Sequence, residues 1–330
     1  MQDIYFEPDY GKIYEELGEG TNHTFVYSDE YGKVSNMFLI RDIPNCIING
    51  VQYKDITTPY GYGGPVVTNF IEGYKDKLID NYINNFREYC LSNHIVSEFI
   101  RFHPIIENAK DFIDVYPIVY QRKTVGTNLK TSDDPIQTEC SKSVRKNVKK
   151  ALKNGVTFQY IESPTNIDNF KEIYYSTMKR NHASDFYYFG QDYFDSLLHY
   201  FNKNILLIKA IYQDKTIAMG FYFIYDKYIH AHLSGTLSEY LYLSPAYVLR
   251  YALIQWGKEH EYSLIHHGGG VSNEENDSLF NFKRRFTKET LFDYYVGKKI
   301  WQPEMYQKLC EKTGTTNVID YFPAYRAIKG

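Results

Sequence analysis

A glycine run and the basic element that follows it are the segments best suited to chemistry in this 330-residue sequence. The run of three glycines, which includes Gly268 and Gly269, ends a predicted strand, and a substrate chain can approach such a backbone closely. Residues 277–286 (DSLFNFKRRF) then predict a short amphipathic element that places Lys283 beside Phe282. A cation in such surroundings can neutralise an oxyanion or a phosphate, which makes Lys283 the candidate catalytic residue. The alternative is a lysine on an exposed face.

The histidine before these glycines completes an HGGG tetrapeptide, which is typical of the oxyanion hole of lipases. That fold also needs a G-x-S-x-G nucleophile elbow, and the sequence contains none. A serine esterase is therefore excluded.

A second glycine-rich segment lies near the N-terminus. Residues 55–65 (DITTPYGYGGP) hold three glycines and two prolines, which predict a turn whose backbone can approach a ligand. Bare N–H groups in such a loop can bind an anion. The candidate substrate-binding residues are Tyr60, Gly61, Tyr62 and Gly63. The alternative is an ordinary tight loop between a strand and a helix.

Residues 141–155 (SKSVRKNVKKALKNG) predict a basic helix, because they contain six basic residues and no acid. The spacing of Val144, Val148 and Leu152 indicates one buried stripe. The other faces carry the cations, of which Arg145 and Lys149 are candidate donor-binding residues. They form either a solvated face or a surface for the phosphates of a nucleotide or an RNA.

Two pairs of histidines suggest a metal site but lack the rest of one. His230 and His232 alternate on a predicted strand and so share one face, and another pair ends the strand at 263–267. Neither a carboxylate nor a cysteine lies at a familiar ligand spacing nearby. We therefore expect no metal, and a packed or substrate-lining role for these imidazoles.

Composition narrows the class of protein. The formal charge is −3, from 37 basic and 40 acidic residues, which argues against a bulk nucleic-acid or membrane coat. Four widely spaced cysteines form neither a zinc ribbon nor a disulfide framework. The acidic N-terminus has no apolar signal region, and no apolar run approaches the length of a membrane span. The sequence predicts a cytoplasmic protein without membrane insertion.

Short strands alternate with amphipathic helices throughout, which predicts a mixed α/β or α+β fold. Three helices are indicated by apolar spacing: one over about 78–89, one over about 167–178, and one that begins at Ser244 and Pro245. The predicted strands cover about 34–41, 51–57, 96–102, 112–121, 156–161, 205–212, 217–225, 228–234, 263–267 and 290–296. The polar stretch 130–142 is the best domain boundary.

The order of these motifs resembles that of the FemAB-like peptidyltransferases and the related GNAT-family N-acyltransferases. The collinear pieces are TPYGYGGP (58–65), SVRKNVKKALKNGV (143–156), STMKRN (176–181) with YYF (187–189), HLSGT (232–236) with LSP (243–245), HHGGG (266–270) and DSLFNFKRRF (277–286). The resemblance implies a twin fold of two GNAT-like units, in the short form that lacks a coiled-coil arm. We expect an N-terminal subdomain over 1–140, onto which about 303–330 packs back. A C-terminal subdomain over 141–302 would carry the catalytic cleft.

The resemblance also implies transfer of an acyl or aminoacyl group to an amine of a cell-envelope sugar or peptide precursor, often one linked to a nucleotide. Lys283 would stand near the reacting carbonyl, and Arg180 would bind phosphates or carboxylates of the precursor. His230 and His232 stand where the peptidoglycan branch often has substrate-contacting tyrosines. Thr68 stands where that branch often has an acid.

Two donors fit this reading, and neither would be a tightly bound cofactor. The small size and the charge of −3 favour an acyl-CoA, held at the N-terminus of the helix that begins at Ser244. The preceding loop, 236–245, has no glycine, unlike the pyrophosphate loop of CoA-dependent GNAT proteins. The alternative donor is aminoacyl-tRNA, with the basic helix as the RNA surface, as in peptidoglycan bridge synthesis. A third hypothesis is a non-catalytic protein that binds a nucleotide-linked precursor; no DNA partner is expected.

Overall fold

The computed structural model describes residues 3–272, 274, 276–316, 318 and 320–327. The chain forms two compact units, one made of Met1–Gln121 with Asp293–Gly330 and the other of Arg122–Phe292. The boundaries between the units lie after Gln121 and Phe292, whereas the sequence predicted boundaries at about 140 and 302. The observed boundaries lie inside two strands, β6 (Ile118–Asn128) and β12 (Leu291–Ile300), because each strand begins in one unit and ends in the other.

The first unit is built on a mixed sheet in the order β1-β2-β3-β5-β12, with β4 paired to β2. Neighbouring strands are antiparallel except β3 and β5, which are parallel. The strands not yet given are β1 (Thr21–Asp29), β2 (Gly32–Ile48), β3 (Val51–Thr57), β4 (Val66–Phe70) and β5 (Ile95–Arg101). The helices are α1 (Pro8–Glu16), α2 (Lys75–Ser92), α3 (Asn108–Asp111) and α10 (Pro303–Thr313), with short 3-10 turns at Ile4–Phe6 and Ala324–Arg326.

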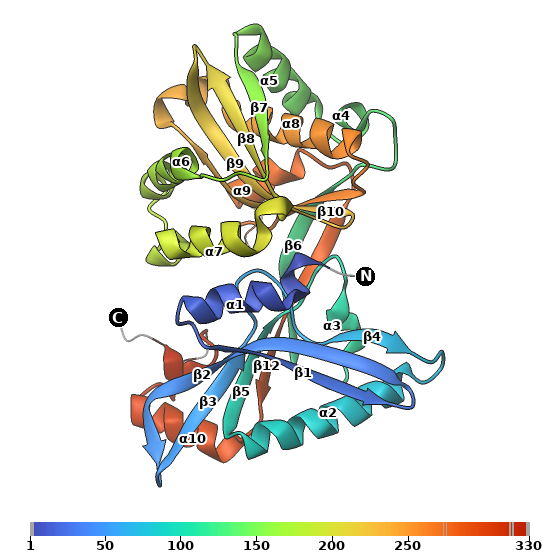
Figure 1. Cartoon of the computed structure of the whole chain (residues 1–330), viewed down its shortest axis with the longest axis vertical. Coiled ribbons are helices and arrows are strands. Elements are labelled where there is room, and N and C mark those ends of the chain that lie inside the picture. The colour runs from blue at the N-terminus through green and yellow to red at the C-terminus, as the bar shows by residue number, and fades with distance from the viewer. Residues whose placement is uncertain (1–2, 273, 275, 317, 319, 328–330) are drawn as a thin grey trace. The chain divides into compact units, whose positions relative to one another are not determined.

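Helix α2 covers one face of this sheet, as Figure 1 shows. Its buried residues recur at helical spacing: Leu78, Ile79, Tyr82, Phe86 and Cys90. They pack against sheet residues such as Val34 and Phe38. The apolar stripe predicted from the sequence therefore forms the helix–sheet interface of this unit.

The C-terminal segment packs on β2 and β5 of the first unit. Leu309, Ala324 and Tyr325 share an apolar cluster with Ile43 and Val96.

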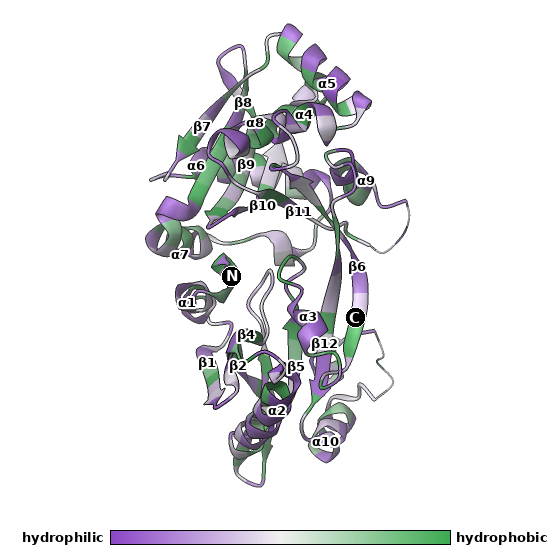
Figure 2. Cartoon of the chain, turned by 90° about the vertical axis from the view of Figure 1, so that its right-hand side faces the viewer, coloured by the Kyte–Doolittle hydropathy of each residue, from purple (hydrophilic) through white to green (hydrophobic). Residues whose placement is uncertain are grey.

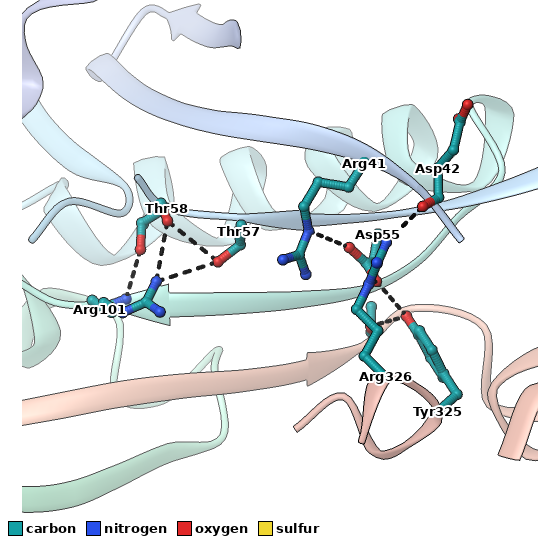
Figure 3. Close-up of polar contacts among 9 residues, drawn as sticks. Arg41, Asp42, Asp55, Thr57, Thr58, Arg101, Tyr325 and Arg326 are labelled. Carbon is teal, nitrogen blue, oxygen red and sulfur yellow. Dashed lines mark hydrogen bonds and ion pairs between the residues drawn. The ribbon is translucent and has the colours of Figure 1, made fainter. Parts of the chain in front are cut away.

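A buried carboxylate adds polar contacts between the C-terminal segment and β3 (Figure 3). Asp55 accepts hydrogen bonds from the Nε atoms of Arg41, at 2.8 Å, and Arg326, at 2.5 Å. The hydroxyl of Tyr325 also donates to Asp55, at 3.1 Å.

The second unit contains the sheet order β6-β11-β10-β9-β8-β7, in which only β10 and β11 are parallel neighbours. The strands are β7 (Thr157–Glu162), β8 (Ile205–Tyr212), β9 (Lys215–Tyr225), β10 (Tyr228–Thr236) and β11 (Leu264–Gly268). The helices are α4 (Pro135–Thr138), α5 (Lys142–Lys153), α6 (Asp168–Arg180), α7 (Gln191–Phe201), α8 (Pro245–Glu259) and α9 (Ser278–Arg284), with 3-10 turns at Asp185–Tyr187, Asn202–Asn204 and Ser238–Leu243.

Alternate residues of the strands face different helices in this unit. Tyr222 of β9 belongs to the apolar cluster that contains Val248 and Leu249 of α8. Its neighbour Phe221 instead packs against Phe170 of α6, with ring centroids 5.5 Å apart. The period-two alternation of the strand therefore separates an α8 side of the sheet from an α6 side.

Strands β10 and β11 pair with each other over only part of their length. Their paired residues run only from Tyr228 with Leu264 to His230 with His266. Strand β10 then continues to Thr236 and β11 to Gly268 without further pairing to each other. Beyond this point β10 remains paired with β9, and Gly268 remains paired with Val125 of β6.

None of the helices in the described part of the chain is both long and apolar enough to cross a membrane.

Candidate functional site

Lys283 lies on α9, whose start is fixed by Asp277. One oxygen of Asp277 accepts the N–H of Phe280 at 2.7 Å and caps the helix. The other oxygen accepts the N–H groups of Val271 and Ser272, each at 2.7 Å. Burial alone would raise the pKa of Asp277, but these N–H groups lower it below its ordinary value. The carboxylate thereby holds the loop after the glycine run and the helix together.

The three glycines let charged side chains approach the end of β11. The ammonium of Lys283 donates to the carbonyl of Gly269 at 2.6 Å, and Arg122 donates to that of Gly270 at 2.6 Å. A Cβ at Gly269 would come within 2.9 Å of the Arg122 side chain. Gly268 has a φ of +73°, and a Cβ there would lie 3.4 Å from the Lys283 ammonium. The run is therefore needed both for its backbone shape and for its lack of side chains.

The surroundings of Lys283 lower the pKa of its side chain. Burial and the positive charges of Arg250 and Arg122 lower the pKa of Lys283 to about 7, although Asp277 opposes the shift. Near neutral pH this side chain therefore exists in both protonation states. As an ammonium it can donate to an oxyanion, and as an amine it can accept a proton.

His267 is a neutral imidazole with a defined tautomer. The Thr127 hydroxyl donates its hydrogen to the carbonyl of Phe286 at 2.6 Å, so it must accept from Nε2 of His267, at 2.8 Å. Burial and the neighbouring charges of Arg250 and Lys283 keep the pKa of His267 well below its ordinary value. Nδ1 is therefore an acceptor, and it is buried without a hydrogen-bond partner among the described residues.

Arg250 of α8 and Tyr222 of β9 are functional candidates that belong to none of the sequence motifs described above. Arg250 is only 8% exposed, and its guanidinium carbon lies 5.9 Å from the centre of the Tyr222 ring. Burial lowers the pKa of Arg250 and raises that of Tyr222. The available sequence signal was a charged residue inside the apolar run YVLRYALIQW at 247–256. A helix that buries most of its faces has no ordinary place for such a charge.

The histidines of β10 lie on the α6 side of the sheet, and they pack with other rings. His232 lies within 2.7 Å of the Tyr193 hydroxyl, and its ring contacts that of Phe223. Burial, with a smaller effect of His230, lowers the pKa of His232 to about 3. The rings of His230 and His266 lie 5.7 Å apart. His266 and His267, although adjacent, belong to opposite sides of β11.

Arg180 ends α6 and reaches the segment that follows β10. Its Nη1 donates to the carbonyl of Thr236 at 2.6 Å and to the hydroxyl of Ser238 at 3.1 Å. One nitrogen of this guanidinium therefore links the end of β10 to the first residue of the 238–243 turn.

The turn before α8 uses many of its own N–H groups. Those of Leu237, Tyr240 and Ser244 donate to backbone carbonyls within 3.2 Å. Ser244 has a left-handed backbone and makes no side-chain cap to α8. The loop expected to receive a CoA pyrophosphate is therefore a closed 3-10 turn, which is a poor substitute for an open anion-binding loop.

The basic helix α5 has the predicted buried stripe, with Ala151 as a further member. Val144, Val148 and Ala151 are buried, whereas Leu152 is half-buried. Most of the helix is hydrophilic in Figure 2. Five lysines along it are exposed: Lys142, Lys146, Lys149, Lys150 and Lys153.

Arg145 and Lys149 line a groove between α4, α5 and α8. Its volume is about 680 Å³. Arg145 donates to the carbonyls of Gln137 and Cys140, so its guanidinium is already used within the unit. The groove also contains Asp133, Asp134 and Glu259, and these acids offset its cations. A highly charged anion therefore gains little there.

The tyrosine–glycine loop belongs to the first unit and is held by internal contacts. The N–H of Gly63 donates to the backbone carbonyl of Arg101 at 2.8 Å, and the carbonyl of Gly63 accepts from the side-chain amide of Asn108 at 2.9 Å. The Tyr60 carbonyl accepts from the Tyr10 hydroxyl at 2.8 Å. Positive φ angles occur at Gly61 and Gly64 but not at Gly63. The backbone contact expected of Gly63 is thus already made within the protein.

Packing also occupies the ring of Tyr62. It meets the rings of Tyr5 and His103, each with a centroid separation of 5.3 Å. A Cβ at Gly61 would lie 2.4 Å from the Tyr5 ring. The space beside Gly61 is therefore filled by a side chain of the unit itself.

The structure thus brings Lys283, Gly268 and Gly269 together, and adds Arg122, Asp277, Arg250, Tyr222 and His267 to them. Phe282 packs instead on Tyr247 and Phe286, with ring centroids 5.1 and 5.2 Å away.

Comparison with known proteins finds similarity in the second half of the chain. Residues 138–286 match the family described as "Acetyltransferase (GNAT) domain". A UDP-N-acetylmuramoylpentapeptide-lysine N(6)-alanyltransferase from Weissella viridescens is 27% identical over 165 residues, which are 49% of this chain. The match spans 48% of the length of that relative, or about half.

Solved structures extend the likeness in fold to nearly the whole chain. The crystal structure of FemX has a TM-score of 0.70 at 13% identity and covers 93% of this chain and 94% of its own. The C-terminal domain of a putative lysylphosphatidylglycerol synthetase from Agrobacterium fabrum has a TM-score of 0.60 at 12% identity, with coverages of 99% and 96%. The expected fold class and the family resemblance of the motifs are confirmed.

Proposed function

We propose that this chain is an aminoacyltransferase that forms an amide on an amino group of a peptide precursor of the cell envelope. The observation that carries the proposal is Lys283, a cation with a pKa lowered to about 7, which is hydrogen-bonded to the glycine run at the end of β11 inside the GNAT-like segment. The named activity of the Weissella viridescens relative supports the aminoacyl group and the muramyl-peptide acceptor. We place the reaction in the cytoplasm, where nucleotide-linked precursors are made.

The reaction joins an amine to an activated carbonyl. The amine nitrogen attacks the carbonyl carbon of an ester, and the carbonyl oxygen takes up the electron pair. When the pair returns, the bond to the leaving oxygen breaks and the amide forms. The leaving oxygen takes the proton that the amine loses. Lys283, as an ammonium, would donate to the carbonyl oxygen while that oxygen is negative, and this stabilises the transition state more than the substrate.

The donor is an aminoacyl ester in this proposal, and an acyl-CoA is the second candidate. The 3-10 turn at 238–243 supports the aminoacyl ester over acyl-CoA, because several backbone N–H groups that would bind the CoA pyrophosphate already donate to backbone carbonyls. The exposed lysines of α5 supply cations for an RNA donor. Arg180 and the aromatic side chains packed around His232 are candidates for acceptor contacts.

Reconstitution tests the proposal directly. The full chain is mixed with a UDP-linked muramyl pentapeptide and either aminoacyl-tRNA or acyl-CoA, and the amide product is detected by mass spectrometry. We expect product with the aminoacyl ester and at least a roughly 10²-fold loss of turnover for Lys283→Met, the usual cost of losing one oxyanion donor. Lys288→Met, at an exposed site of the same unit, is the matched control.

Two results would contradict the proposal. Turnover of Lys283→Met within about threefold of the wild type removes this lysine from the mechanism. Tight binding of the precursor with no product from either donor would mark the chain as a non-catalytic binder.

A further inference from the structure

Three buried polar atoms on the α8 side of the second unit have no hydrogen-bond partner among the described residues. They are Nη1 of Arg250, the hydroxyl of Tyr222 and Nδ1 of His267. The exposed fractions of these residues are 8%, 1% and 1%. They come from α8, β9 and β11, far apart in sequence. Most buried polar side chains in folded proteins are paired, so three unpaired ones in one region need a physical explanation.

These atoms lie in one electrostatic neighbourhood. The guanidinium of Arg250 lies over the Tyr222 ring, at 5.9 Å from its centre. The charge of Arg250 also acts on both His267 and Lys283. Lys283 in turn reaches the half-exposed glycine run at the end of β11. Lys283 therefore links the half-exposed glycine run to the neighbourhood of the buried atoms.

The charge of this neighbourhood is positive and lacks a matching acid. Arg122, Arg250 and Lys283 are its cations, and no ion pair is formed by any of them within the described part of the chain. Asp277, whose charge acts on Lys283, is engaged by three backbone N–H groups. A buried cation without a partner destabilises a fold, so a fold that keeps one is stabilised by an anion that binds to it.

We propose that Arg250, Tyr222 and His267 form a binding site for the ribose phosphate of the donor substrate. The inference rests on the proposed transfer reaction. Arg250 and Tyr222 donate to phosphate oxygens, and the lone pair on Nδ1 of His267 accepts from a ribose hydroxyl. A bare phosphate would be repelled by that lone pair, whereas a sugar phosphate offers an anion and a hydroxyl side by side. Because the three atoms are covered in the free chain, the site opens as the ligand enters.

Ribose phosphate is shared by both candidate donors. The 3′ end of a tRNA carries its aminoacyl ester on a ribose a few bonds from a phosphate. In CoA the ribose phosphate lies far from the thioester, beyond the pantetheine arm. A site that adjoins Lys283 therefore suits the nucleotide ester better, and competition between the two distinguishes them.

The test measures binding rather than turnover, by titration calorimetry on the full chain. AMP is the probe and adenosine is its phosphate-free control. We expect AMP to bind at least about tenfold more tightly than adenosine. Arg250→Gln should remove that difference, because glutamine cannot make the charged hydrogen bonds of the guanidinium to the phosphate. Arg284→Gln, at an exposed position on α9, should leave AMP affinity unchanged.

Tyr222→Phe keeps the test decisive if Arg250→Gln fails to fold. Loss of an unpaired buried hydroxyl does not destabilise a protein, so this variant should melt at or above the wild-type temperature. We expect its AMP affinity to fall about threefold or more. Unchanged AMP affinity in Tyr222→Phe or in folded Arg250→Gln overturns the site. So does equal binding of AMP and adenosine to the wild type.

Competition identifies the source of the ribose phosphate. A 5′-phosphorylated CCA trinucleotide and CoA are each titrated against bound AMP. Displacement by either supports a donor site and names the donor. If neither displaces AMP, the site does not belong to the donor and the proposal is overturned. These outcomes do not depend on amide formation, so they are separate from failure of the proposed reaction.

Discussion

The charge state of Lys283 depends on neighbours that its own sequence segment does not contain. Arg250 and Arg122 come from α8 and β6, and with burial they lower the pKa of Lys283 to about 7. The ordinary value for lysine lies above 10. A residue that needs a proton to stabilise an oxyanion would therefore lose it just above neutral pH.

This shift predicts the pH dependence of the transfer. With Lys283 acting as an ammonium, kcat should fall as pH rises through about 7. Lys283→Arg keeps its proton throughout this range, so its profile should lack that falling limb even if its maximum is lower. A pH–rate profile of both proteins checks this. A rate that instead rises through about 7 would mean that neutral Lys283 is the active form, as a base.

The tyrosine–glycine loop gives a second prediction about single residues. Gly61 has a φ of +100° and a Cβ there would meet the Tyr5 ring, whereas at Gly63 the nearest atom would be a Thr58 methyl at 3.2 Å. Gly61→Ala should therefore lower the melting temperature by several degrees more than Gly63→Ala. Thermal unfolding of both variants measures this. An equal or larger loss for Gly63→Ala would contradict the packing described for this loop.

Strand β5 carries a buried acid, Glu98, whose titration should change the free energy of unfolding. Glu98 is 1% exposed and accepts from the Asn36 amide at 3.3 Å. Burial raises its pKa to about 7, although Asn36 and other partners lower it. The folded chain therefore binds a proton more tightly than the unfolded chain does.

The sign of the resulting effect follows from linkage. Between about pH 4.5 and 7 the folded state holds more protons on Glu98 than the unfolded state, so the free energy of unfolding falls as pH rises through this window. The total loss is about 3 kcal/mol. Glu98→Gln resembles the protonated acid and should lack this loss, which leaves it more stable than the wild type at pH 8. Denaturant titrations at pH 5 and 8 measure the difference; parallel behaviour of both proteins would show that Glu98 does not titrate there.

The basic helix α5 gives a prediction that separates the two donors. If an RNA donor lies on it, the four exposed lysines Lys146, Lys149, Lys150 and Lys153 neutralise phosphates. Four contacts give a slope of log K against log salt near −3, at about −0.7 for each phosphate of a single strand. Reversal of the four charges should then abolish binding of aminoacyl-tRNA. A shallow slope and donor affinity within about twofold in that variant would favour acyl-CoA.

At the scale of the molecule, the first unit is assembled from the two ends of the chain. Asp55 on β3 is paired with Arg41 and with Arg326 near the C-terminus (Figure 3). The carboxylate side chain is 1% exposed. The Asp55–Arg326 ion pair therefore connects the C-terminal segment to strand β3.

Removal of this carboxylate should leave cations close together without compensation. We expect Asp55→Ala to lower the free energy of unfolding by about 3–5 kcal/mol, the usual cost of breaking a buried ion pair. Asp9→Ala, which breaks the exposed pair with Lys12, is the control and should cost at most about 1 kcal/mol. Chemical denaturation of both variants tests this. A cost for Asp55→Ala no larger than that of the control would mean that the network does not hold the C-terminal segment.

Local pattern determined much of the fold. The strands predicted at 51–57 and 205–212 coincide with β3 and β8, and the helices predicted near 78–89, 167–178 and from 245 all form. These segments carry their own periodicity, which neighbouring residues are enough to define. Strands β1 and β4 were not predicted, because their polar residues hide the alternation and their pairing with β2 comes from elsewhere in the chain. Residues 112–117 were predicted as strand, but β6 begins only at Ile118.

The sequence by itself also determined the family resemblance and the candidate lysine, because motif order and glycine runs are local properties of the chain. Only the tertiary structure decided what surrounds that lysine. Arg250, Tyr222 and His267 are 17 or more residues apart, and their burial without partners appears only when α8, β9 and β11 are packed. Burial and the distance between charges set their chemistry, and both are properties of the folded chain that spacing along the sequence does not contain.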